Sequence, residues 1–334
     1  MNLTEVYEAE FCIQSSSSSC VRTALLTTVD VFLYLSAAAA VLLTVCGNLL
    51  VIISICHFKQ LHTPTNLLLL SLALSDILVG VIVMPFQFTL LIESCWLFGT
   101  TFCSILNLFS LYLTCVSIYN VTFIAVDRFI ALFDPFHYSN RVTVRVTLLV
   151  ICFIWILSIF YTMALLYFNG NMLEQKTCPI VCPVSISLIW ATVDLIVGFI
   201  VPCLTMILLY VHIFALAKKH AESIKCVGKQ QFKNARKGNS MASEWKAAKL
   251  LGIIVSVFLM CLVPYNIGLL ATANVEKTAT SGHLIPNFLA CLIFLNSTMN
   301  PIIYALFYPW FQKCVKLIIR LKIFSSGSSQ INVF

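Results

Sequence analysis

Long apolar runs limit what this chain can fold into more than any other feature of its sequence. A helix needs about 20 apolar residues to cross the hydrocarbon core of a bilayer. Runs of at least that length lie at 29–56, 65–92, 101–133, 146–168, 185–217, 247–273 and 284–307. Backbone amides in lipid must find their hydrogen-bond partners within the segment, so these seven runs predict helices that span a membrane.

The composition agrees with a lipid environment. Hydrophobic residues make up 60% of the chain and charged residues 10%, whereas a soluble domain carries about 25% charged residues. The alternating pattern of a membrane barrel is absent from the sequence. We therefore predict an all-α membrane protein with a seven-transmembrane helix bundle at 29–308. An extracellular tail at 1–28 precedes it, and a short amphipathic eighth helix at 309–322 and a cytoplasmic tail at 323–334 follow it.

Basic residues determine the predicted orientation. Of the 20 Lys and Arg residues, only Arg22, Lys176 and Lys277 fall in the N-terminal tail or the even-numbered loops. Cytoplasmic loops carry the excess of Lys and Arg, so we expect a multi-pass plasma-membrane protein with its N-terminus outside and its C-terminus in the cytoplasm. The net charge of +7 then reflects contact with anionic membrane lipid and does not indicate a nucleic-acid partner.

The sequence shows no motif typical of an enzyme's catalytic site. Metal-spaced Cys/His clusters, phosphate-cradling glycine loops and Ser-His-Asp patterns are all absent. The one long loop, 218–246, is polar and basic, and we expect it to face cytoplasmic partner proteins. The sequence predicts neither an enzyme nor an organic cofactor.

Six cysteines lie on the predicted outer side: Cys12, Cys20, Cys95, Cys103, Cys178 and Cys182. The oxidising face permits disulfides, and spacing alone leaves their pairing open. The same outer tail contains the sequon Asn2-Leu3-Thr4, which predicts glycosylation of Asn2.

Polar residues inside the apolar runs indicate function, because lipid penalises them. Asp76 lies in the middle of the second run, and its expected neighbours are Ser117, Asn296, Ser297 and Asn300. Their oxygen atoms suit a hard cation, and we predict a bound sodium ion there. The alternative is a hydrogen-bonded network that holds the helices together. We favour a role in conformational change over contact with a ligand.

Two further groups of residues suggest movable parts. Pro301, between Asn300 and Tyr304, removes a backbone hydrogen bond and kinks the seventh run, where a helix can bend between two states. The alternative is a passive kink.

At the cytoplasmic end of the third run, Asp127 is followed by Arg128, and Glu244 carries the opposite charge at the same depth of the sixth run. We predict an Arg128–Glu244 clamp whose release frees the sixth helix. The alternative is an interfacial arginine that reaches for the headgroups.

Ordered motifs resemble those of the rhodopsin-like G-protein-coupled receptors, one for each span. They are Gly47-Asn48, LALSD ending at Asp76, Asp127-Arg128-Phe129, Trp155, Pro202 with Tyr210, Phe258 with Pro264, and Asn300-Pro301-Ile302-Ile303-Tyr304. The segments HFKQLHTPTN (57–66), ESCWLFG (93–99), AAKLLGI (247–253) and NPIIYALFYPWF (300–311) resemble the trace amine-associated receptors more narrowly.

This resemblance implies disulfides and a partner. It pairs Cys103 with Cys182 and Cys20 with Cys178, with Cys12 as the rival for the second bridge. It also implies a heterotrimeric G protein of the stimulatory, olfactory type, with Tyr210 and Phe258 among the residues of the activation switch.

The resemblance also places the ligand site. Where such receptors carry an Asp in the third span, this chain has Ser110, and the carboxylate stands instead at Asp194 in the fifth. The sequence resembles the fish-type receptors with an acidic residue at that site. The residues predicted to line the ligand site are Ser110, Leu111, Thr114, Asp194, Tyr265, Asn266 and Phe294. Leu262 replaces the usual Trp of the sixth span, which leaves a roomier floor.

Asp194 also supports an amine ligand on physical grounds alone. A carboxylate at mid-span costs about 2.5–3.5 kcal/mol, so it should face the bundle and find a partner. Lys, Arg and His are absent at that depth of the spans, and an ammonium ligand can supply the missing cation. The alternatives are a protonated Asp194 bonded to a neighbouring helix, or one that lines water without binding a ligand.

The sequence as a whole therefore predicts a plasma-membrane receptor that binds a small amine and activates a stimulatory G protein through outward movement of the sixth helix. One alternative is a receptor of the same fold for a ligand that is not an amine. The other is a transporter, although the spans lack the internal repeats of most carriers.

Overall fold

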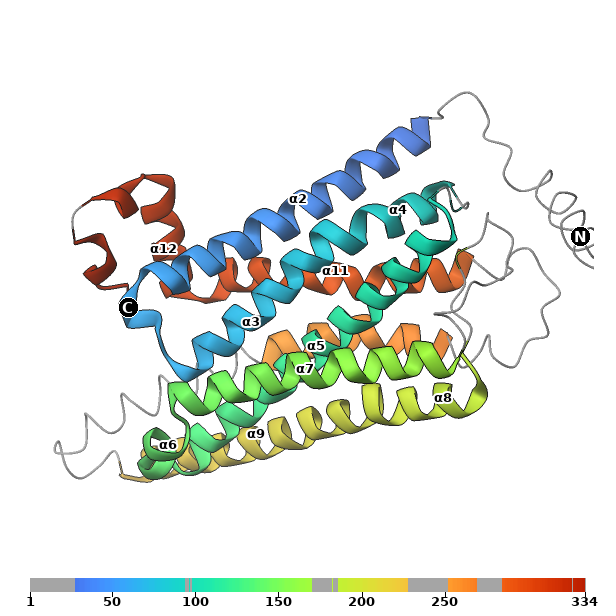
Figure 1. Ribbon diagram of the computed structural model, residues 1–334. Helices are drawn as coiled ribbons and strands as arrows, with labels where there is room; N and C mark the ends of the chain where they lie inside the picture. The colour runs from blue at the N-terminus through green and yellow to red at the C-terminus, as the bar shows by residue number, and fades with distance from the viewer. Residues whose placement is uncertain are drawn as a thin grey trace, which may run out of the picture.

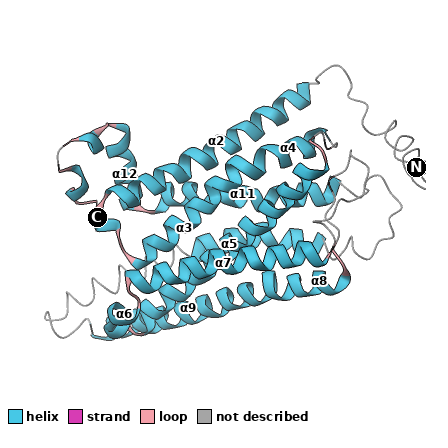
Figure 2. Cartoon of the chain, viewed as in Figure 1, coloured by secondary structure: helices cyan, strands magenta, loops and turns pink. Residues whose placement is uncertain are grey.

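The computed structural model describes residues 28–93, 96, 98–169, 182, 186–227, 252–268, 284–325 and 327–333. Throughout this described part the regular elements are helices, and the long ones run side by side as a bundle (Figures 1 and 2). Six of them are long and apolar enough to cross a membrane, and a shorter apolar helix covers Gly252–Gly268. The predicted all-α membrane fold is confirmed.

The spans lie close to their predicted positions. They are α2 (Thr28–His57), α3 (Pro64–Leu78) continued through η2 (Val79–Val83) and α4 (Met84–Glu93), α5 (Thr100–Phe133), α7 (Val144–Phe168), α8 (Leu188–Val193) continued through η3 (Asp194–Ile200) and α9 (Val201–Val227), the helix at Gly252–Gly268, and α11 (Leu284–Phe307). Local capping fixes several starts. For example, the Thr63 hydroxyl accepts from the Asn66 amide, with Pro64 in the first helical turn.

Two of the spans contain a π-helical turn, and each turn ends just before a proline. In η2 the amide of Met84 donates to the carbonyl of Val79, and Pro85 follows. In η3 the amide of Val201 donates to the carbonyl of Ile196, and Pro202 follows. A proline clashes with the carbonyl four residues before it, and a wider π turn relieves that clash.

The bundle is apolar on its outside and carries its polar residues within. Leu149 and Phe160 of α7 are 71% and 69% exposed, as expected for side chains that face lipid. Asn48, Asp76 and Asn300 are almost fully buried between α2, α3 and α11. Glycine permits a close approach there, because a Cβ at Gly47 would lie 2.7 Å from the Pro301 ring.

A short amphipathic helix, α12 (Pro309–Ile319), follows the last span and ends before Leu321, which adopts a left-handed conformation with φ of 55°. The chain then folds back towards the loop between α2 and α3 (Figure 1). The amide of Val333 donates to the Gln60 side chain at 3.2 Å, and Val333 is buried. The predicted tail at 323–334 therefore contacts the first loop along its described residues.

Candidate functional site

Asp194 begins the π-helical turn η3 in the fifth span. One of its carboxylate oxygens, Oδ1, accepts a hydrogen bond of 2.7 Å from the hydroxyl of Tyr161 on α7. Pro202 follows this turn and has no amide hydrogen to donate to the Val197 carbonyl. The hydroxyl of Tyr119 on α5 donates to that carbonyl instead, at 3.2 Å. Two tyrosines from neighbouring helices therefore fix the turn that carries Asp194.

The surroundings of Asp194 are apolar and uncharged. The side chain is half-buried, and it interacts electrostatically with Cys115, Tyr119 and Tyr265. Within the described residues, no Lys, Arg or His pairs with it. Its hydrogen bond to α7 is the contact expected of one alternative, a carboxyl group bonded to a neighbouring helix. The Tyr161 hydroxyl is neutral, however, so it does not balance the charge of a carboxylate.

Ser110 and Thr114, two of the predicted ligand residues, form a polar stripe on α5 inside the bundle. Ser110 is buried, and its hydroxyl has no hydrogen-bond partner in the described part of the chain. The Thr114 hydroxyl donates to the backbone carbonyl of Ser110 at 2.7 Å. Leu111 is half-buried on the same helix. An unpartnered buried hydroxyl is costly, and Ser110 can therefore donate to or accept from a polar group that enters the site.

A small cavity of about 10 Å³ lies beneath this stripe, enough for about one water molecule. Its lining comprises Val79, Thr114, Ser117, Phe258, Leu262, Ile293, Phe294, Asn296 and Ser297. Thr114 and Phe294 of the predicted ligand site thus meet Ser117 and Asn296 of the predicted sodium site. Leu262 lines the cavity, so the position that lacks the usual Trp adjoins open space.

The other two predicted ligand residues lie on the helix at Gly252–Gly268. Tyr265 is half-buried and within electrostatic range of Asp194. The Asn266 side chain donates to the Leu262 carbonyl at 3.0 Å, which leaves its own carbonyl oxygen available to a ligand.

The predicted sodium residues are all buried. Asp76 accepts from the Asn300 side chain at 2.7 Å through Oδ2, and the Ser297 side chain also faces the carboxylate. Its Oδ1 is buried, and among the described residues no donor lies at a normal hydrogen-bond distance and angle from it. Ser117 bonds Ser75 at 3.2 Å, and Asn296 lines the adjoining cavity. An unpartnered carboxylate oxygen beside hydroxyl and amide oxygens is a donor set that fits a hard cation.

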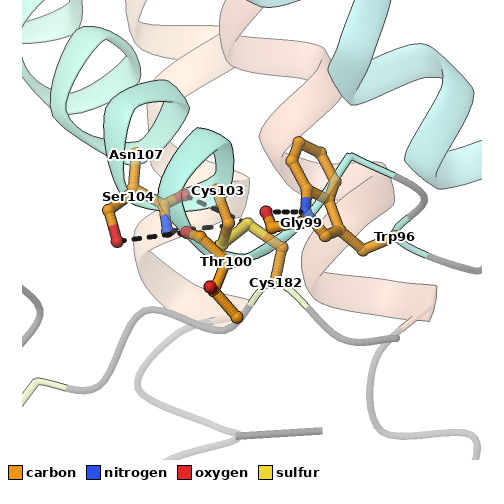
Figure 3. The surroundings of a disulfide bond; sticks show 7 residues. All are labelled: Trp96, Gly99, Thr100, Cys103, Ser104, Asn107 and Cys182. Carbon is orange, nitrogen blue, oxygen red and sulfur yellow. Dashed lines mark hydrogen bonds between the residues drawn. A yellow bond between two sulfur atoms is a disulfide. The ribbon is translucent and has the colours of Figure 1, made fainter. Parts of the chain in front are cut away.

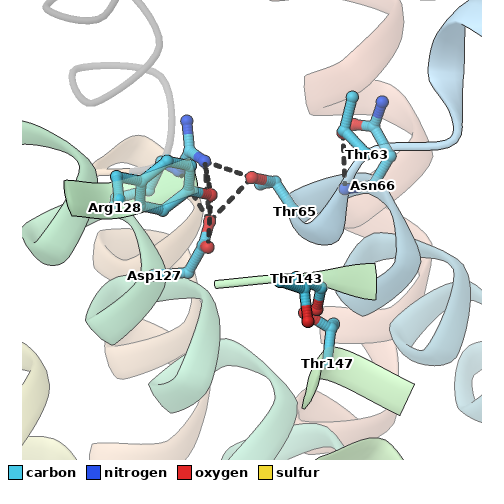
Figure 4. Close-up of polar contacts among 8 residues, drawn as sticks. Thr63, Thr65, Asn66, Asp127, Arg128, Thr143 and Thr147 are labelled. Carbon is cyan, nitrogen blue, oxygen red and sulfur yellow. Dashed lines mark hydrogen bonds and ion pairs between the residues drawn. The ribbon is translucent and has the colours of Figure 1, made fainter. Parts of the chain in front are cut away.

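The C-terminal end of α5 carries a denser network (Figure 4). Arg128 pairs with Asp127 at 2.7 Å and donates to the hydroxyl of Thr65 on α3. Tyr138 of the short helix α6 (Pro135–Arg141) donates to Asp127 at 2.7 Å. Burial and the Asp127 carboxylate raise the pKa of Tyr138 to about 12. Glu244, the predicted clamp partner of Arg128, lies outside the described residues.

The remaining residues of the predicted switch lie in the core of the bundle. Phe258 is buried, and so are Tyr210 and Tyr304, whose hydroxyls have no hydrogen-bond partner among the described residues. Pro301 lies inside α11, between Asn300 and Tyr304. Two unpartnered buried hydroxyls indicate a region whose hydrogen bonds are completed in another arrangement or by water.

The disulfide between Cys103 and Cys182 that the resemblance implied is present, with Cα atoms 5.6 Å apart (Figure 3). It ties the start of α5 to the segment before the fifth span, and Asn107 contacts both sulfur atoms. The other predicted features of the outer side, namely Cys12, Cys20, Cys178 and Asn2, lie outside the described residues.

Sequence reasoning missed the tyrosines that join these networks. Three tyrosine hydroxyls donate to Asp194, to the Val197 carbonyl and to Asp127, namely those of Tyr161, Tyr119 and Tyr138. None of the three was a predicted site residue. A tyrosine within an apolar run is itself a signal, because its hydroxyl needs a partner in lipid. The sequence did not indicate which helix supplies that partner.

Comparison with known proteins identifies the family. The model of the family described as "7 transmembrane receptor (rhodopsin family)" matches residues 47–304. Trace amine-associated receptor 13c of Danio rerio is 40% identical, in an alignment covering 98% of this chain and 96% of the relative. Trace amine-associated receptor 7c of Rattus norvegicus is 38% identical (100% and 94%), and receptor 4 of Mus musculus is 36% identical (96% and 94%).

The membership excludes an enzyme and a carrier, and it agrees with the apolar helices. The chain is a multi-pass plasma-membrane protein, a G-protein-coupled receptor that belongs to the rhodopsin family and, within it, to the trace amine-associated receptors.

Proposed function

We propose that this receptor binds a small amine through Asp194 and signals through a stimulatory G protein. The observation that carries the proposal is a half-buried carboxylate whose hydrogen-bond donor is a neutral tyrosine and which has no cationic partner among the described residues. An ammonium group supplies the charge that the described helices do not. The names of the relatives, all trace amine-associated receptors, agree with this ligand class.

The rest of the ligand lies between the fifth, third, sixth and seventh spans. The unpartnered hydroxyl of Ser110 and the open carbonyl of Asn266 suit a polar group. Tyr265 and Phe294 offer apolar and cation–π contact. The cavity beside Leu262, of about 10 Å³, has room for about one water molecule next to the ligand.

Binding shifts the receptor towards a state in which the sixth helix moves outward. A ligand drives such a shift only by its differential affinity for the two states. The Asp127–Arg128–Thr65 network stabilises the closed state, and the unpartnered hydroxyls of Tyr210 and Tyr304 favour a second arrangement. Outward movement opens the cytoplasmic end beside Arg128 to the G protein.

Sodium binds in the closed state at Asp76. The unpartnered Oδ1, with Ser117, Asn296 and Asn300 nearby, provides the oxygen ligands. The ion supplies positive charge to a buried carboxylate and so stabilises the packing of α3 against α5 and α11.

The N-terminus faces the outside and the C-terminus the cytoplasm. The distribution of Lys and Arg supports this orientation. The Cys103–Cys182 disulfide gives independent support, because it lies at the start of α5 and structural disulfides persist on the oxidising side of the membrane.

The test is a cyclic AMP assay in cells that express the receptor with an olfactory or stimulatory G protein. Alkyl monoamines, diamines, the matching alcohols and the matching carboxylic acids are compared on wild type and Asp194→Asn. We expect monoamines to activate wild type, and the variant to lose roughly 10- to 100-fold in potency because a hydrogen bond between charged groups is lost.

The variant Ser110→Asp adds a second carboxylate to the ligand site, on α5. A diamine can pair one ammonium with each carboxylate, so we expect diamines to gain potency relative to monoamines. Unchanged amine potency in Asp194→Asn would refute recognition at Asp194. Activation by carboxylic acids or alcohols instead of amines would establish the alternative, a receptor of the same fold for another ligand class.

A further inference from the structure

We propose that Tyr161 is a positioning residue for the amine: its hydroxyl holds Oδ1 of Asp194 so that the second oxygen, Oδ2, receives the ammonium. The inference rests on the proposed function and concerns a residue on α7, outside the predicted ligand site. Three observations around the carboxylate carry it.

The first is the hydrogen bond itself. The Tyr161 hydroxyl lies 2.7 Å from Oδ1, a normal length for an O–H donor to an oxygen acceptor. Within the described residues, no hydrogen bond reaches Oδ2. A carboxylate has two oxygens and about four acceptor sites, so the bond from Tyr161 leaves one whole oxygen available to an incoming N–H donor.

The second observation is the shape of the turn. Gly198 lies one turn after Asp194, and a Cβ there would come within 3.0 Å of Oδ1. The absence of a side chain at Gly198 therefore leaves room for Oδ1 of Asp194 beside the helix backbone, where it meets Tyr161 of α7. Gly198 thus leaves the space that Oδ1 occupies, and the Tyr161 hydroxyl holds the oxygen there.

The third observation is the anchoring of the π turn by Tyr119. Its hydroxyl bonds the Val197 carbonyl, which Pro202 cannot satisfy. The backbone below Asp194 is therefore held independently of the carboxylate. Loss of the Tyr161 hydroxyl should let the Asp194 side chain rotate without unwinding the turn. A Tyr161 variant therefore tests the orientation of the carboxylate and not the folding of the helix.

A positioned carboxylate and a freely rotating one differ in how they bind amines. An ammonium with N–H groups needs a correctly aimed oxygen, because hydrogen bonds weaken steeply with angle. A trimethylammonium group has no N–H and responds mainly to charge at short range. Tyr161 should therefore matter more for a primary amine than for its trimethylammonium analogue.

The experiment compares wild type with Tyr161→Phe, Gly198→Ala, Asp194→Asn and the control Tyr167→Phe. Tyr167 lies on the same helix but is 65% exposed, so its variant removes a hydroxyl that faces lipid. The probes are the most potent primary alkylamine of the panel and its trimethylammonium analogue. Potency and maximal cyclic AMP are measured at matched surface expression, and the analogue is scored as agonist or competitor.

We expect Tyr161→Phe and Gly198→Ala to lower the potency of the primary amine by about tenfold with unchanged maximal response. The trimethylammonium analogue should shift by about twofold or less, and Tyr167→Phe should resemble wild type. A shift in Tyr161→Phe that is equal for both probes, or absent, overturns the positioning role.

A ligand-free measurement accompanies the assay. Melting temperatures of detergent-purified Tyr161→Phe, Asp194→Asn and the double variant should be non-additive, because residues in contact couple; additive values also overturn the proposal. If Asp194→Asn keeps full amine potency, the proposed function fails and the role of Tyr161 fails with it. If only Asp194→Asn loses potency, amine recognition stands and the role of Tyr161 alone is refuted.

Discussion

At the C-terminal end of α5, one tyrosine hydroxyl contacts both members of a charged pair. Tyr138 donates to Asp127 at 2.7 Å and accepts from Arg128 at 3.2 Å. The guanidinium and the carboxylate are both largely buried, and each depends on such neighbours for its remaining hydrogen bonds. Tyr138 thus helps to hold Arg128 in the arrangement that we assign to the closed state.

Tyr138→Phe should raise ligand-independent signalling. A hydrogen bond to a charged group is worth about 1 kcal/mol or more, and losing 1 kcal/mol from the closed state raises a small active fraction about fivefold. Basal cyclic AMP at matched surface expression measures it. Asp134→Asn is the control for the same short helix, because asparagine keeps the cap that Asp134 forms with the His137 amide. Equal basal activity in Tyr138→Phe and wild type would exclude this role.

The same hydroxyl should not make basal activity depend on pH. An ordinary tyrosine titrates near pH 10, and burial with the Asp127 carboxylate raises the pKa of Tyr138 to about 12. A raised pKa keeps the group protonated at higher pH, so the hydroxyl donates throughout the physiological range. Any pH dependence of basal activity therefore has another source.

Among the helices, close approach at a glycine is the clearest constraint. A Cβ on Gly47 of α2 would lie 2.7 Å from the ring of Pro301, which is itself rigid. At Gly252 a Cβ would meet the Tyr210 ring at 3.4 Å, an ordinary contact. The two positions differ in the space that the neighbouring side chain leaves.

Gly47→Ala should therefore destabilise the receptor by about 1–3 kcal/mol, the usual cost of overpacking, whereas Gly252→Ala should be nearly neutral. Melting curves of the purified proteins in one detergent measure both. Equal melting temperatures for the two variants would mean that α2 can move away from α11 at little cost.

The elements also indicate what sequence patterns can predict. The positions of the spans could be predicted from the lengths of the apolar runs, because every helix that crosses lipid needs a long apolar segment. The π turns before Pro85 and Pro202 could not, since a proline in a helix can also produce a kink. The partner of Asp194 could not be predicted either, because Tyr161 and Tyr167 lie in the same apolar run and only packing decides which one faces the bundle.

Over the whole molecule, two carboxylates lie within the membrane-spanning part of the bundle, the half-buried Asp194 and the fully buried Asp76. Asp194 is near the ligand site, and Asp76 lies deeper, bonded to Asn300 of the kinked helix α11. The small cavity beside Leu262 joins residues of both sites, Thr114 and Phe294 with Ser117 and Asn296. Occupancy of one site should consequently alter the affinity of the other, and such coupling is reciprocal.

This coupling predicts that sodium opposes the amine. An ion at Asp76 stabilises the closed packing. Amine potency should therefore be lower in a sodium medium than in a potassium medium, by about fivefold for a coupling of about 1 kcal/mol. Potassium is the replacement of choice, because an organic ammonium would compete at Asp194. Asp76→Asn removes the charge that holds the ion while keeping an amide beside Asn300, and it should abolish the difference between the two salts. A sodium effect of the same size in Asp76→Asn would place the ion elsewhere and would separate the two carboxylates into independent sites.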